Sequence, residues 1–264
     1  MTRGVVCIAH NTPDVDYYKM ACYTAERVNR FLNLPVTIIT DTTSVTDTGY
    51  QFDNIRYVTP DSNNIRDKKV WINKGRYQVY DLTPYDDTLV IDIDYMVNSQ
   101  QLLKTFDYPS DFVCHNSVSW IMSPNQVPEF FDKSRLDILW ATVMRFTRSS
   151  KTEQIFGMIK MIQENYQHYS DLHGFMNINY RNDYALTAAL HTVNGNTNTP
   201  EDYLTWDLVH VNHDISVDRT DDTEYIMKKK ILASRTDTVG TINYIRVRDM
   251  DFHMLNKDNF GRLM

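Results

Sequence analysis

Cysteine is scarce in this sequence of 264 residues. The three cysteines, Cys7, Cys22 and Cys114, are odd in number and irregularly spaced. They form neither the close Cys-x-x-Cys pair of a zinc site nor the even-numbered set of a disulfide framework. A reducing, cytoplasmic setting is therefore expected.

Long apolar runs are also missing. The apolar stretch near the N-terminus, at residues 4–9, is too short for the core of a signal peptide. No later stretch approaches the run of about 18 apolar residues that a membrane-spanning helix needs. We therefore expect a soluble protein without a membrane partner.

The chain has no excess of positive charge, since its formal net charge is −7 at pH 7. A protein that binds nucleic acids in general is usually basic, so the overall charge argues against DNA or RNA as a general partner. A local basic face can still override the total. Two basic clusters, more often solvated faces than polyanion sites, are Arg135/Arg145/Arg148/Lys151 and 228–230.

What the sequence does contain is enough apolar material for a core, with 42% hydrophobic and 12% aromatic residues. A chain of this length and composition folds without disulfide support. We find no internal repeat, no low-complexity segment and no clear linker between domains. A single mixed α/β domain over residues 1–264 is the expected organisation.

The first 41 residues have the pattern of a strand, a helix and a second strand. Apolar, β-branched residues at 4–9 and at 35–41 indicate buried strands. Between them, residues 14–33 have the periodicity of an amphipathic helix, with Thr12 and Pro13 expected at its start. Short connections between such elements are typical of a parallel sheet in an α/β fold.

The rest of the chain continues this mixture of strands and helices. We therefore predict a Rossmann-like α/β fold with a mixed, mainly parallel central sheet flanked by helices. Further strands are expected at 54–58, 88–93, 111–116, 117–122, 203–211 and 241–248. Further helices are expected at 68–82, 98–106, 151–169 and 183–191.

Two aspartates stand at the end of an apolar strand, in the stretch LVIDID at residues 89–94. Alternate residues of a strand point to the same side, so Asp92 and Asp94 should share a face. Ligands of open α/β sheets gather at such strand ends. Two neighbouring carboxylates repel each other unless a cation lies between them, and a hard divalent ion suits their oxygens. The alternative is a plain solvent-exposed strand end, because Asp-x-Asp also occurs at 14–16 and 249–251.

The aspartate pair and its position after the βαβ unit resemble the Asp-x-Asp motif of GT-A fold glycosyltransferases. The resemblance is to the retaining branch that includes glycogenin-like and galactosyltransferase-like enzymes. It implies that Asp92 and Asp94 hold Mn²⁺ or Mg²⁺ against the diphosphate of a nucleotide sugar, expected to be a UDP-sugar. It also divides the chain into a donor-binding half, about 1–97, and an acceptor-binding half, about 98–264.

Three other stretches are similar to that branch. KGRYQVYDLTPYDDTLVIDID, residues 74–94, resembles the segment that enters the motif, and this implies that Lys74 and Arg76 help to bind the donor. RNDYALTAAL, residues 181–190, resembles an element that aims Asp183, with Asn182 beside it, at the transferred sugar. An ordinary helix cap is the alternative for Asp183.

The third stretch is HMLNK, residues 253–257. It resembles the C-terminal segment in which a histidine completes the metal site and a lysine contacts the diphosphate. The resemblance therefore implies that His253 is a metal ligand and that Lys257 binds phosphate. The stretch departs from the longer His-Phe-x-Gly-x-x-Lys pattern, because its glycine is missing and its spacing is shorter.

Residues after the first two strands complete the implied donor site. In the GT-A fold the residues just after the first strand cradle the base and ribose, and here these are His10 and Asn11. Asp41 ends the second strand, where a carboxylate that contacts the base is expected.

The identity of the acceptor is the property that the sequence determines least. The compact size and short loops resemble small bacteriophage glycosyltransferases, some of which modify hydroxymethylated bases of phage DNA. That reading would place the protein in the host cytoplasm and give it DNA as a partner. A saccharide or a protein acceptor is the alternative.

Two other functions remain open from the sequence. A nucleotidyltransferase shares an α/β fold and metal-binding carboxylates, but it usually has a Gly-rich, basic loop after the first strand, which HNTPDVD at residues 10–16 lacks. A non-catalytic nucleotide-sugar-binding protein of the same fold is the second alternative.

Overall fold

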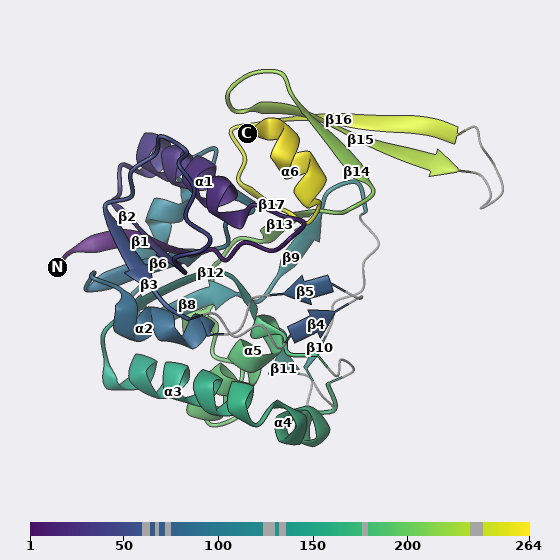
Figure 1. The fold of residues 1–264 in the computed structure, drawn as a ribbon. Helices are drawn as coiled ribbons and strands as arrows, with labels where there is room; N and C mark the ends of the chain where they lie inside the picture. The colour runs from purple at the N-terminus through teal and green to yellow at the C-terminus, as the bar shows by residue number, and fades with distance from the viewer. Residues whose placement is uncertain are drawn as a thin grey trace.

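A six-stranded sheet forms the centre of the computed structural model, which describes residues 1–59, 64–66, 69–71, 75–123, 130–131, 136–175, 179–232 and 240–264. The strand order is β3-β2-β1-β6-β12-β8 (Figure 1). All strands are parallel except β12, which runs antiparallel to both of its neighbours. The predicted mixed, mainly parallel sheet is therefore confirmed. In sheet order, the strands span Asn54–Tyr57, Val36–Thr40, Arg3–Ile8, Asp87–Ile91, Trp140–Thr147 and Phe112–His115.

Both faces of this sheet are covered, which explains the unbroken apolar runs. The strands β2 and β6 are buried at every position. One face packs against helix α1, Tyr17–Leu32. The other packs against α3, Ser150–Glu164, and α5, Asn182–Val193, with the short helix α2, Val79–Leu82, beside them (Figure 1).

A second, four-stranded sheet brings the C-terminal part of the chain to the end of β6. Its order is β7-β17-β13-β9, and its strands span Tyr95–Met96, Phe252–Met254, Leu208–Val211 and Val118–Trp120. The strands β17 and β7 are antiparallel, with His253 opposite Tyr95. This register places His253, near the C-terminus, opposite the residue that directly follows Asp94.

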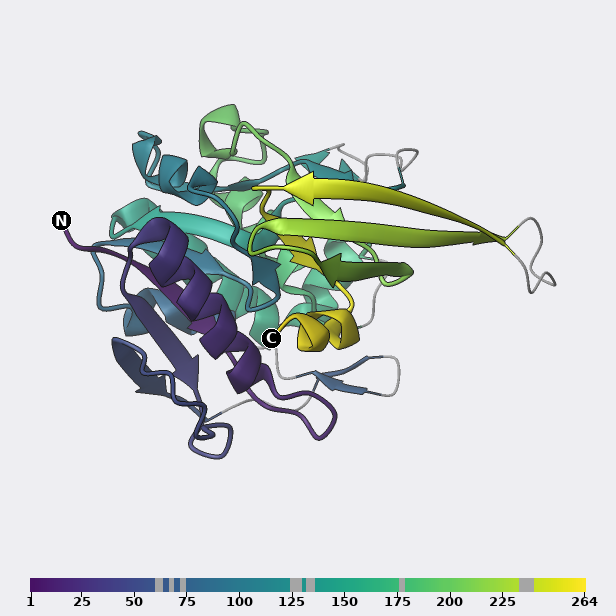
Figure 2. The ribbon, with the colours of Figure 1, turned by 90° about the horizontal axis from the view of Figure 1, so that it is seen from above.

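An antiparallel three-stranded sheet, β14-β15-β16, follows β13 in the chain. The strands β15 and β16 extend as a long ribbon away from the body of the molecule (Figures 1 and 2). They are Glu224–Leu232 and Gly240–Arg248, and β14 is Ile215–Arg219. The C-terminal helix α6, Lys257–Leu263, follows β17 directly.

The remaining elements are short. They are α4, Tyr166–His173; the strands β4, Asn64–Arg66, β5, Lys69–Trp71, β10, Phe130–Phe131, and β11, Leu136–Asp137; and three 3-10 helices, Arg76–Gln78, Gln101–Asp107 and Pro200–Asp202. Within the ranges that the structure describes, every helix is too short or too polar to cross a bilayer.

The helix expected over 68–82 is confirmed in its second half and wrong in its first. Residues 69–71 form strand β5, whereas the 3-10 turn at 76–78 and α2 at 79–82 are helical. Residues 68 and 72–74 lie outside the described residues. Gly75, with φ at 85°, precedes the 3-10 turn, and the extended residue Thr83 before Pro84 ends α2.

The expected start of the first helix is also wrong. The helix α1 begins at Tyr17, and the Asp16 carboxylate caps it by accepting a hydrogen bond from the backbone N–H of Lys19 at 2.9 Å. Residues Thr12 to Val15 form a turn before it. The predicted helix 151–169 is divided at Asn165 into α3 and α4.

Other boundaries shift more modestly, and one central strand was not foreseen. Residues 101–107, expected as an α-helix from 98, are 3-10 helical, and only 208–211 of the predicted strand 203–211 is extended. The strand β12 was not predicted from the sequence. Its apolar pattern is interrupted by Arg145. This side chain is buried in a bidentate ion pair with Asp87, in which the Nε and Nη2 atoms lie 2.5 Å and 2.9 Å from the two carboxylate oxygens.

Gly4 in β1 is required by close packing, since a Cβ atom there would overlap the Tyr85 ring. We expect Gly4→Ala to lower the free energy of unfolding by about 1–3 kcal/mol, because the buried ring must shift. Gly157→Ala is the control, because open space surrounds Gly157 on α3. It should raise stability by up to about 1 kcal/mol. Urea unfolding monitored by circular dichroism measures both, and equal effects would contradict the packing argument.

Candidate functional site

Three parallel strands end at one edge of the central sheet. The chain leaves β1 towards His10, β2 towards Asp41 and β6 towards Asp92. The strand order reverses between β1 and β6, because β2 and β3 continue on one side and β12 and β8 on the other. Crevices at such reversals are the usual ligand sites of open α/β sheets.

The aspartate pair lies in a turn rather than in the strand. The strand β6 ends at Ile91, and the backbone N–H of Tyr95 donates to the Asp92 carbonyl at 3.0 Å. The expectation that Asp92 and Asp94 share a face because they alternate along a strand is therefore wrong. The two carboxylates converge nonetheless, because the turn reverses the chain so that β7 can pair with β17.

His253 lies against both carboxylates. Its Nε2 atom is 3.1 Å from an Asp94 oxygen and 4.0 Å from an Asp92 oxygen. One ligand atom from each of the three residues lies within 4.8 Å of the other two. The predicted metal-ligand set is thus brought together in space from two distant parts of the chain.

Two basic side chains contact the same carboxylates. The Arg76 guanidinium pairs with Asp92, and the Lys257 ammonium group pairs with Asp94. Arg76 also donates to the Ala141 carbonyl at 2.6 Å. Two negative and two positive charges therefore meet in one small volume.

The ionisation states of this cluster follow from burial. Burial lowers the pKa of His253, although Asp92 and Asp183 act in the opposite direction, so the imidazole is neutral at neutral pH. Burial also lowers the pKa of Lys257 to about 8, against the attraction of Asp92. Lys257 therefore remains mainly charged at pH 7.

Asp183 lies close to this cluster, in the first turn of α5. Its carboxylate accepts a hydrogen bond from the backbone N–H of Ala141 at 3.0 Å and lies 3.3 Å from Arg181. The pairing of β12 with β8 shifts register between Trp140 and Met144, and bulges of this kind often lie next to active sites. Ala141 falls within this irregular stretch and contacts Asp183 through its N–H and Arg76 through its carbonyl. Asn182, the first residue of α5, is partly exposed.

Asp41 and His10 form a buried pair beside this edge. The His10 Nδ1 atom is 2.9 Å from an Asp41 oxygen, and Asp41 also accepts hydrogen bonds from Thr43 and Ser44. Burial tends to raise the pKa of Asp41, but the hydrogen bonds from Ser44, Thr43 and His10 outweigh it and lower the pKa. Asp41 thus organises the loop and orients His10.

Asn11 is engaged in the same loop. Its side chain donates to the Ser44 carbonyl at 3.2 Å and accepts from the backbone N–H of Tyr18 at 2.8 Å. A nucleotide base that contacted Asp41 would have to replace one of the hydrogen bonds to that carboxylate, whereas the Asn11 amide also has a second N–H and a second lone pair. Lys74, which was expected to help bind the donor, lies outside the described residues.

The sequence did not indicate that another histidine, His210, lies beside His253. The His210 Nε2 atom lies 3.3 Å from His253 Nδ1. The rings of Trp120 and Trp140 pack against His210 with centroids at 4.7 Å and 5.0 Å. No motif includes His210, and the one available signal was a histidine within the apolar run Leu208–Val211.

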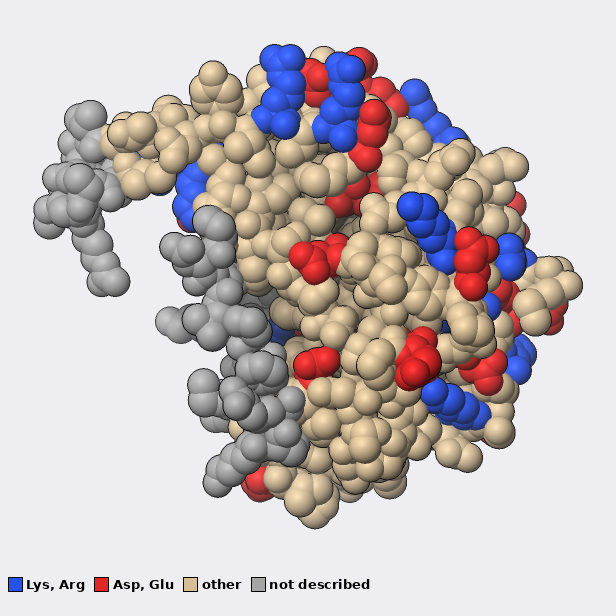
Figure 3. Space-filling view, turned by 180° about the vertical axis from the view of Figure 1, so that it is seen from behind, with Lys and Arg blue, Asp and Glu red and all other residues tan. Residues whose placement is uncertain are grey.

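Most of the described basic side chains that were considered as a polyanion site form ion pairs with acidic side chains of the same chain. Lys151 pairs with Asp202 at 2.7 Å, as Arg145 does with Asp87. Lys228 pairs with Asp218 at 2.6 Å. On the face shown in Figure 3, the Lys and Arg side chains of the described residues lie beside acidic ones and form no broad basic field.

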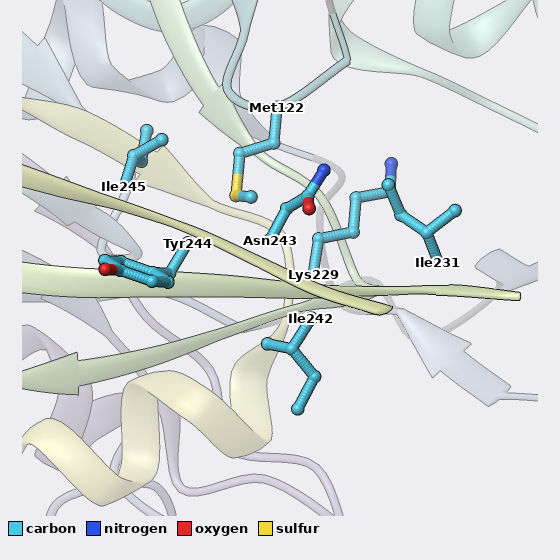
Figure 4. A pocket seen from close by; sticks show the side chains of 7 residues that line it. All are labelled: Met122, Lys229, Ile231, Ile242, Asn243, Tyr244 and Ile245. Atoms are coloured by element: carbon cyan, nitrogen blue, oxygen red, sulfur yellow. The ribbon is translucent and has the colours of Figure 1, made fainter. Parts of the chain in front are cut away.

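A hollow of about 490 Å³ lies along the projecting ribbon, apart from the residues named above (Figure 4). Lys229 reaches from it to Ser123 at 2.9 Å and so ties the ribbon to the segment after β9. Its lining combines apolar and polar side chains, namely Met122, Lys229, Ile231, Ile242, Asn243, Tyr244 and Ile245.

Comparison with known proteins gives distant similarities only. No protein-family model matches the chain, and a search of curated proteins finds no match. Similar solved structures include the glycosyltransferase GlyE of Streptococcus pneumoniae TIGR4, at 13% identity and a TM-score of 0.42 over 76% of this chain. The chain spans less than half of GlyE, 44% of its length.

Two further similar structures are transferases of sugars. One is the galactosyltransferase LgtC in complex with donor and acceptor sugar analogues, at 16% identity and a TM-score of 0.44, over 71% of this chain and 70% of LgtC. The other is mouse xyloside xylosyltransferase 1, at 10% identity and a TM-score of 0.45, over 78% of this chain and 86% of that one. At these values the likeness by itself assigns neither a family nor an activity.

The lowered pKa of Asp41 predicts a dependence of stability on pH. A carboxyl group whose pKa is lower in the folded state stabilises the fold above its unfolded pKa, about 4, and this contribution is lost as the pH falls below that value. We expect Asp41→Asn to destabilise by about 1–3 kcal/mol at pH 7. The difference from the wild type should shrink between about pH 4 and pH 2. Urea unfolding at several pH values measures it, and a constant difference would contradict the assignment.

Proposed function

We propose that the chain is a metal-dependent glycosyltransferase of the GT-A type, which transfers a sugar from a nucleotide-diphosphate sugar to an acceptor hydroxyl. The observation that carries this proposal is the convergence of Asp92, Asp94 and His253 at the ends of parallel strands. Two basic side chains, Arg76 and Lys257, lie against the same carboxylates. We propose a UDP-sugar as the donor, on the basis of the sequence resemblance.

The chemistry of the donor set fits a divalent cation. Two carboxylates and one neutral imidazole offer oxygen and nitrogen ligands, a combination that suits Mn²⁺, with Mg²⁺ as the second candidate. The His253 Nε2 atom is 3.1 Å and 4.0 Å from the carboxylate oxygens of Asp94 and Asp92, so one ion could contact all three residues. The contacts of Arg76 and Lys257 with these carboxylates support a cluster that favours positive charge.

In the reaction, the bond between the anomeric carbon and the diphosphate oxygen breaks, and a bond to the acceptor oxygen forms as its hydroxyl proton leaves. A bound divalent cation supplies positive charge to the departing diphosphate. Arg76 and Lys257 are placed to add to that charge once their carboxylate partners bind the cation. Positive groups fixed where negative charge develops lower the barrier without reorganisation.

We assign Asp183 to the sugar. Its carboxylate accepts a hydrogen bond from the N–H of Ala141, the residue whose carbonyl accepts from Arg76, and its negative charge acts on His253. A carboxylate there can orient sugar hydroxyls and stabilise the positive charge that develops on the ring. We propose this role rather than that of a nucleophile, with Asn182 beside it. Retention of the anomeric configuration is an expectation from the resemblance alone.

The proposed donor half is about 1–97 and the acceptor half about 98–264. For the acceptor we propose a saccharide or a protein hydroxyl. A hydroxymethylated base of phage DNA would need a basic rim beside the cluster, and Arg145, Lys151 and Lys228 are engaged in pairs within the chain. Arg135, from the same group, lies outside the described residues.

Release of UDP from a panel of UDP-sugars, with and without Mn²⁺, tests the proposal. A glycosyltransferase releases UDP, by slow hydrolysis if no acceptor is present. A nucleotidyltransferase would release pyrophosphate from a nucleoside triphosphate instead. A non-catalytic binding protein would be stabilised thermally by the UDP-sugar, by about 2.7 kcal/mol at 100 times its dissociation constant, without any release of UDP.

Asp94 is one of the two proposed carboxylate ligands of the cation. Asp94→Asn should lower kcat/KM by about 10²–10³-fold, because the cation loses a charged ligand. The fold should remain, as judged by circular dichroism. Asp218→Asn is the matched control, since Asp218 is also a carboxylate paired with a lysine but is exposed on β14. Near-normal activity of Asp94→Asn would show that the metal assignment is wrong.

The second prediction concerns Asp183. Asp183→Asn retains an oxygen for the Ala141 N–H but removes the negative charge. We expect kcat to fall by about 100-fold, an amount typical of losing one charge-stabilising group. The affinity for UDP, measured by calorimetry, should stay nearly constant, because Asp183 is assigned to the sugar. A comparable loss in both quantities would move Asp183 away from the sugar.

A further inference from the structure

His210 is the direct neighbour of the proposed metal ligand His253. It lies on β13, which pairs in parallel with β17 so that His210 and His253 are register partners. Its Nε2 atom is 3.3 Å from His253 Nδ1, the nitrogen that faces away from the carboxylates. Both imidazoles are buried, with 1% and 7% of their surface exposed. The two rings therefore form an isolated pair behind the cluster.

The other side of His210 is enclosed by aromatic rings. The planes of Trp120 and Trp140 each lie at 85° to the imidazole. Within the described part of the chain, His210 Nδ1 has no hydrogen-bond partner. The His210 ring is buried, and burial disfavours the charged imidazolium form, so the ring is taken to carry a single proton.

Two neutral imidazoles that share one contact can be arranged in only two ways. In one, His210 Nε2–H donates to His253 Nδ1, and His253 Nε2 carries a proton that points to Asp94. In the other, His253 Nδ1–H donates to His210 Nε2, and the lone pair of His253 Nε2 faces the carboxylates. Only the second arrangement leaves His253 able to bind a cation, because a protonated nitrogen has no lone pair to offer.

We propose that His210 is a positioning residue for the metal site, which accepts a hydrogen bond from His253 Nδ1–H and so keeps the Nε2 lone pair directed at the space between Asp92 and Asp94. A metal-binding histidine generally donates its second N–H to a neighbouring acceptor, which fixes the tautomer and the ring orientation. Here the acceptor is an imidazole rather than a carbonyl or a carboxylate.

An imidazole has a property in this position that neither of those acceptors has. By moving its single proton between Nε2 and Nδ1, His210 can donate to His253 when no cation is bound and accept from it when a cation is bound. The free Nδ1 side allows both forms, because no partner in the described structure selects one of them. This inference rests on the proposed function, since it assumes a cation at the cluster.

Binding of Mn²⁺ to the purified chain, measured by calorimetry and by the paramagnetic resonance signal of free Mn²⁺, tests the proposal without reference to activity. His210→Met removes the acceptor and should weaken Mn²⁺ binding by about 10–100-fold. His210→Gln supplies an amide that can accept or donate, and it should retain affinity within about threefold of the wild type, in contrast to that loss.

The matched control is His115→Met. His115 is a second buried histidine, with 0% of its surface exposed, and it bonds the Trp206 carbonyl at 2.9 Å rather than His253. This variant should lose stability without losing Mn²⁺ affinity. If His210→Met binds Mn²⁺ as tightly as the wild type, the proposal for His210 is overturned while the proposed function stands. If the wild type binds no divalent ion, both are overturned.

A spectroscopic measurement on the wild type keeps the proposal testable even where His210→Met does not fold. With ¹⁵N-labelled histidine and diamagnetic Mg²⁺ at saturation, long-range nitrogen–proton correlations report which ring nitrogen carries the proton. We expect the proton on Nδ1 in both His253 and His210. A proton on Nε2 of His253 in the saturated protein would overturn the assignment.

Discussion

Two carboxylates at the end of a buried strand repel each other, and the structure around β6 is arranged to relieve that repulsion. Arg76 and Lys257 contribute positive charge, while His253 packs against the carboxylates as a neutral imidazole because burial lowers its pKa. The basic pair would be unnecessary if Asp92 and Asp94 faced open water. In the proposed function the same electrostatic demand attracts a divalent cation and a diphosphate.

A buried polar network fixes the backbone that carries this cluster. The Asn98 N–H donates to the Asp251 carboxylate at 2.7 Å, and Arg27 donates to the Val97 carbonyl at 2.7 Å and to the Asn98 side chain at 2.6 Å. Burial raises the pKa of Asp251 to about 6 in spite of the hydrogen bond from the Asn98 N–H. The network joins the end of β7 to the start of β17, so it sets the register that brings His253 opposite Tyr95. Buried polar groups of this kind specify one arrangement, because any other leaves them unsatisfied.

The sequence predicted the parts of this molecule that depend on local pattern. The apolar run before Asp92 and the helix from Asn182 follow from periodicity and residue type, and His253 came from a resemblance at the C-terminus. Features set by tertiary contacts were not predictable. The strand β12 was missed because Arg145, a charged residue in the middle of a strand, is neutralised only by a partner 58 residues away. His210 was missed because its significance depends entirely on which residue lies opposite it in the neighbouring strand.

The irregular pairing of β12 has a consequence for how the site can vary. Ala141 contacts Arg76 through its carbonyl and Asp183 through its N–H, so one residue's main chain sets the separation between the two side chains. Ala141 belongs to β12, the strand between β6 and β8, but it lies in the stretch where the register with β8 shifts. In the proposed function, this main-chain segment therefore sets the spacing between the group assigned to the phosphate, Arg76, and the group assigned to the sugar, Asp183. An insertion or deletion in this irregular stretch would change that spacing, whereas a substitution of a neighbouring side chain would leave both main-chain hydrogen bonds in place.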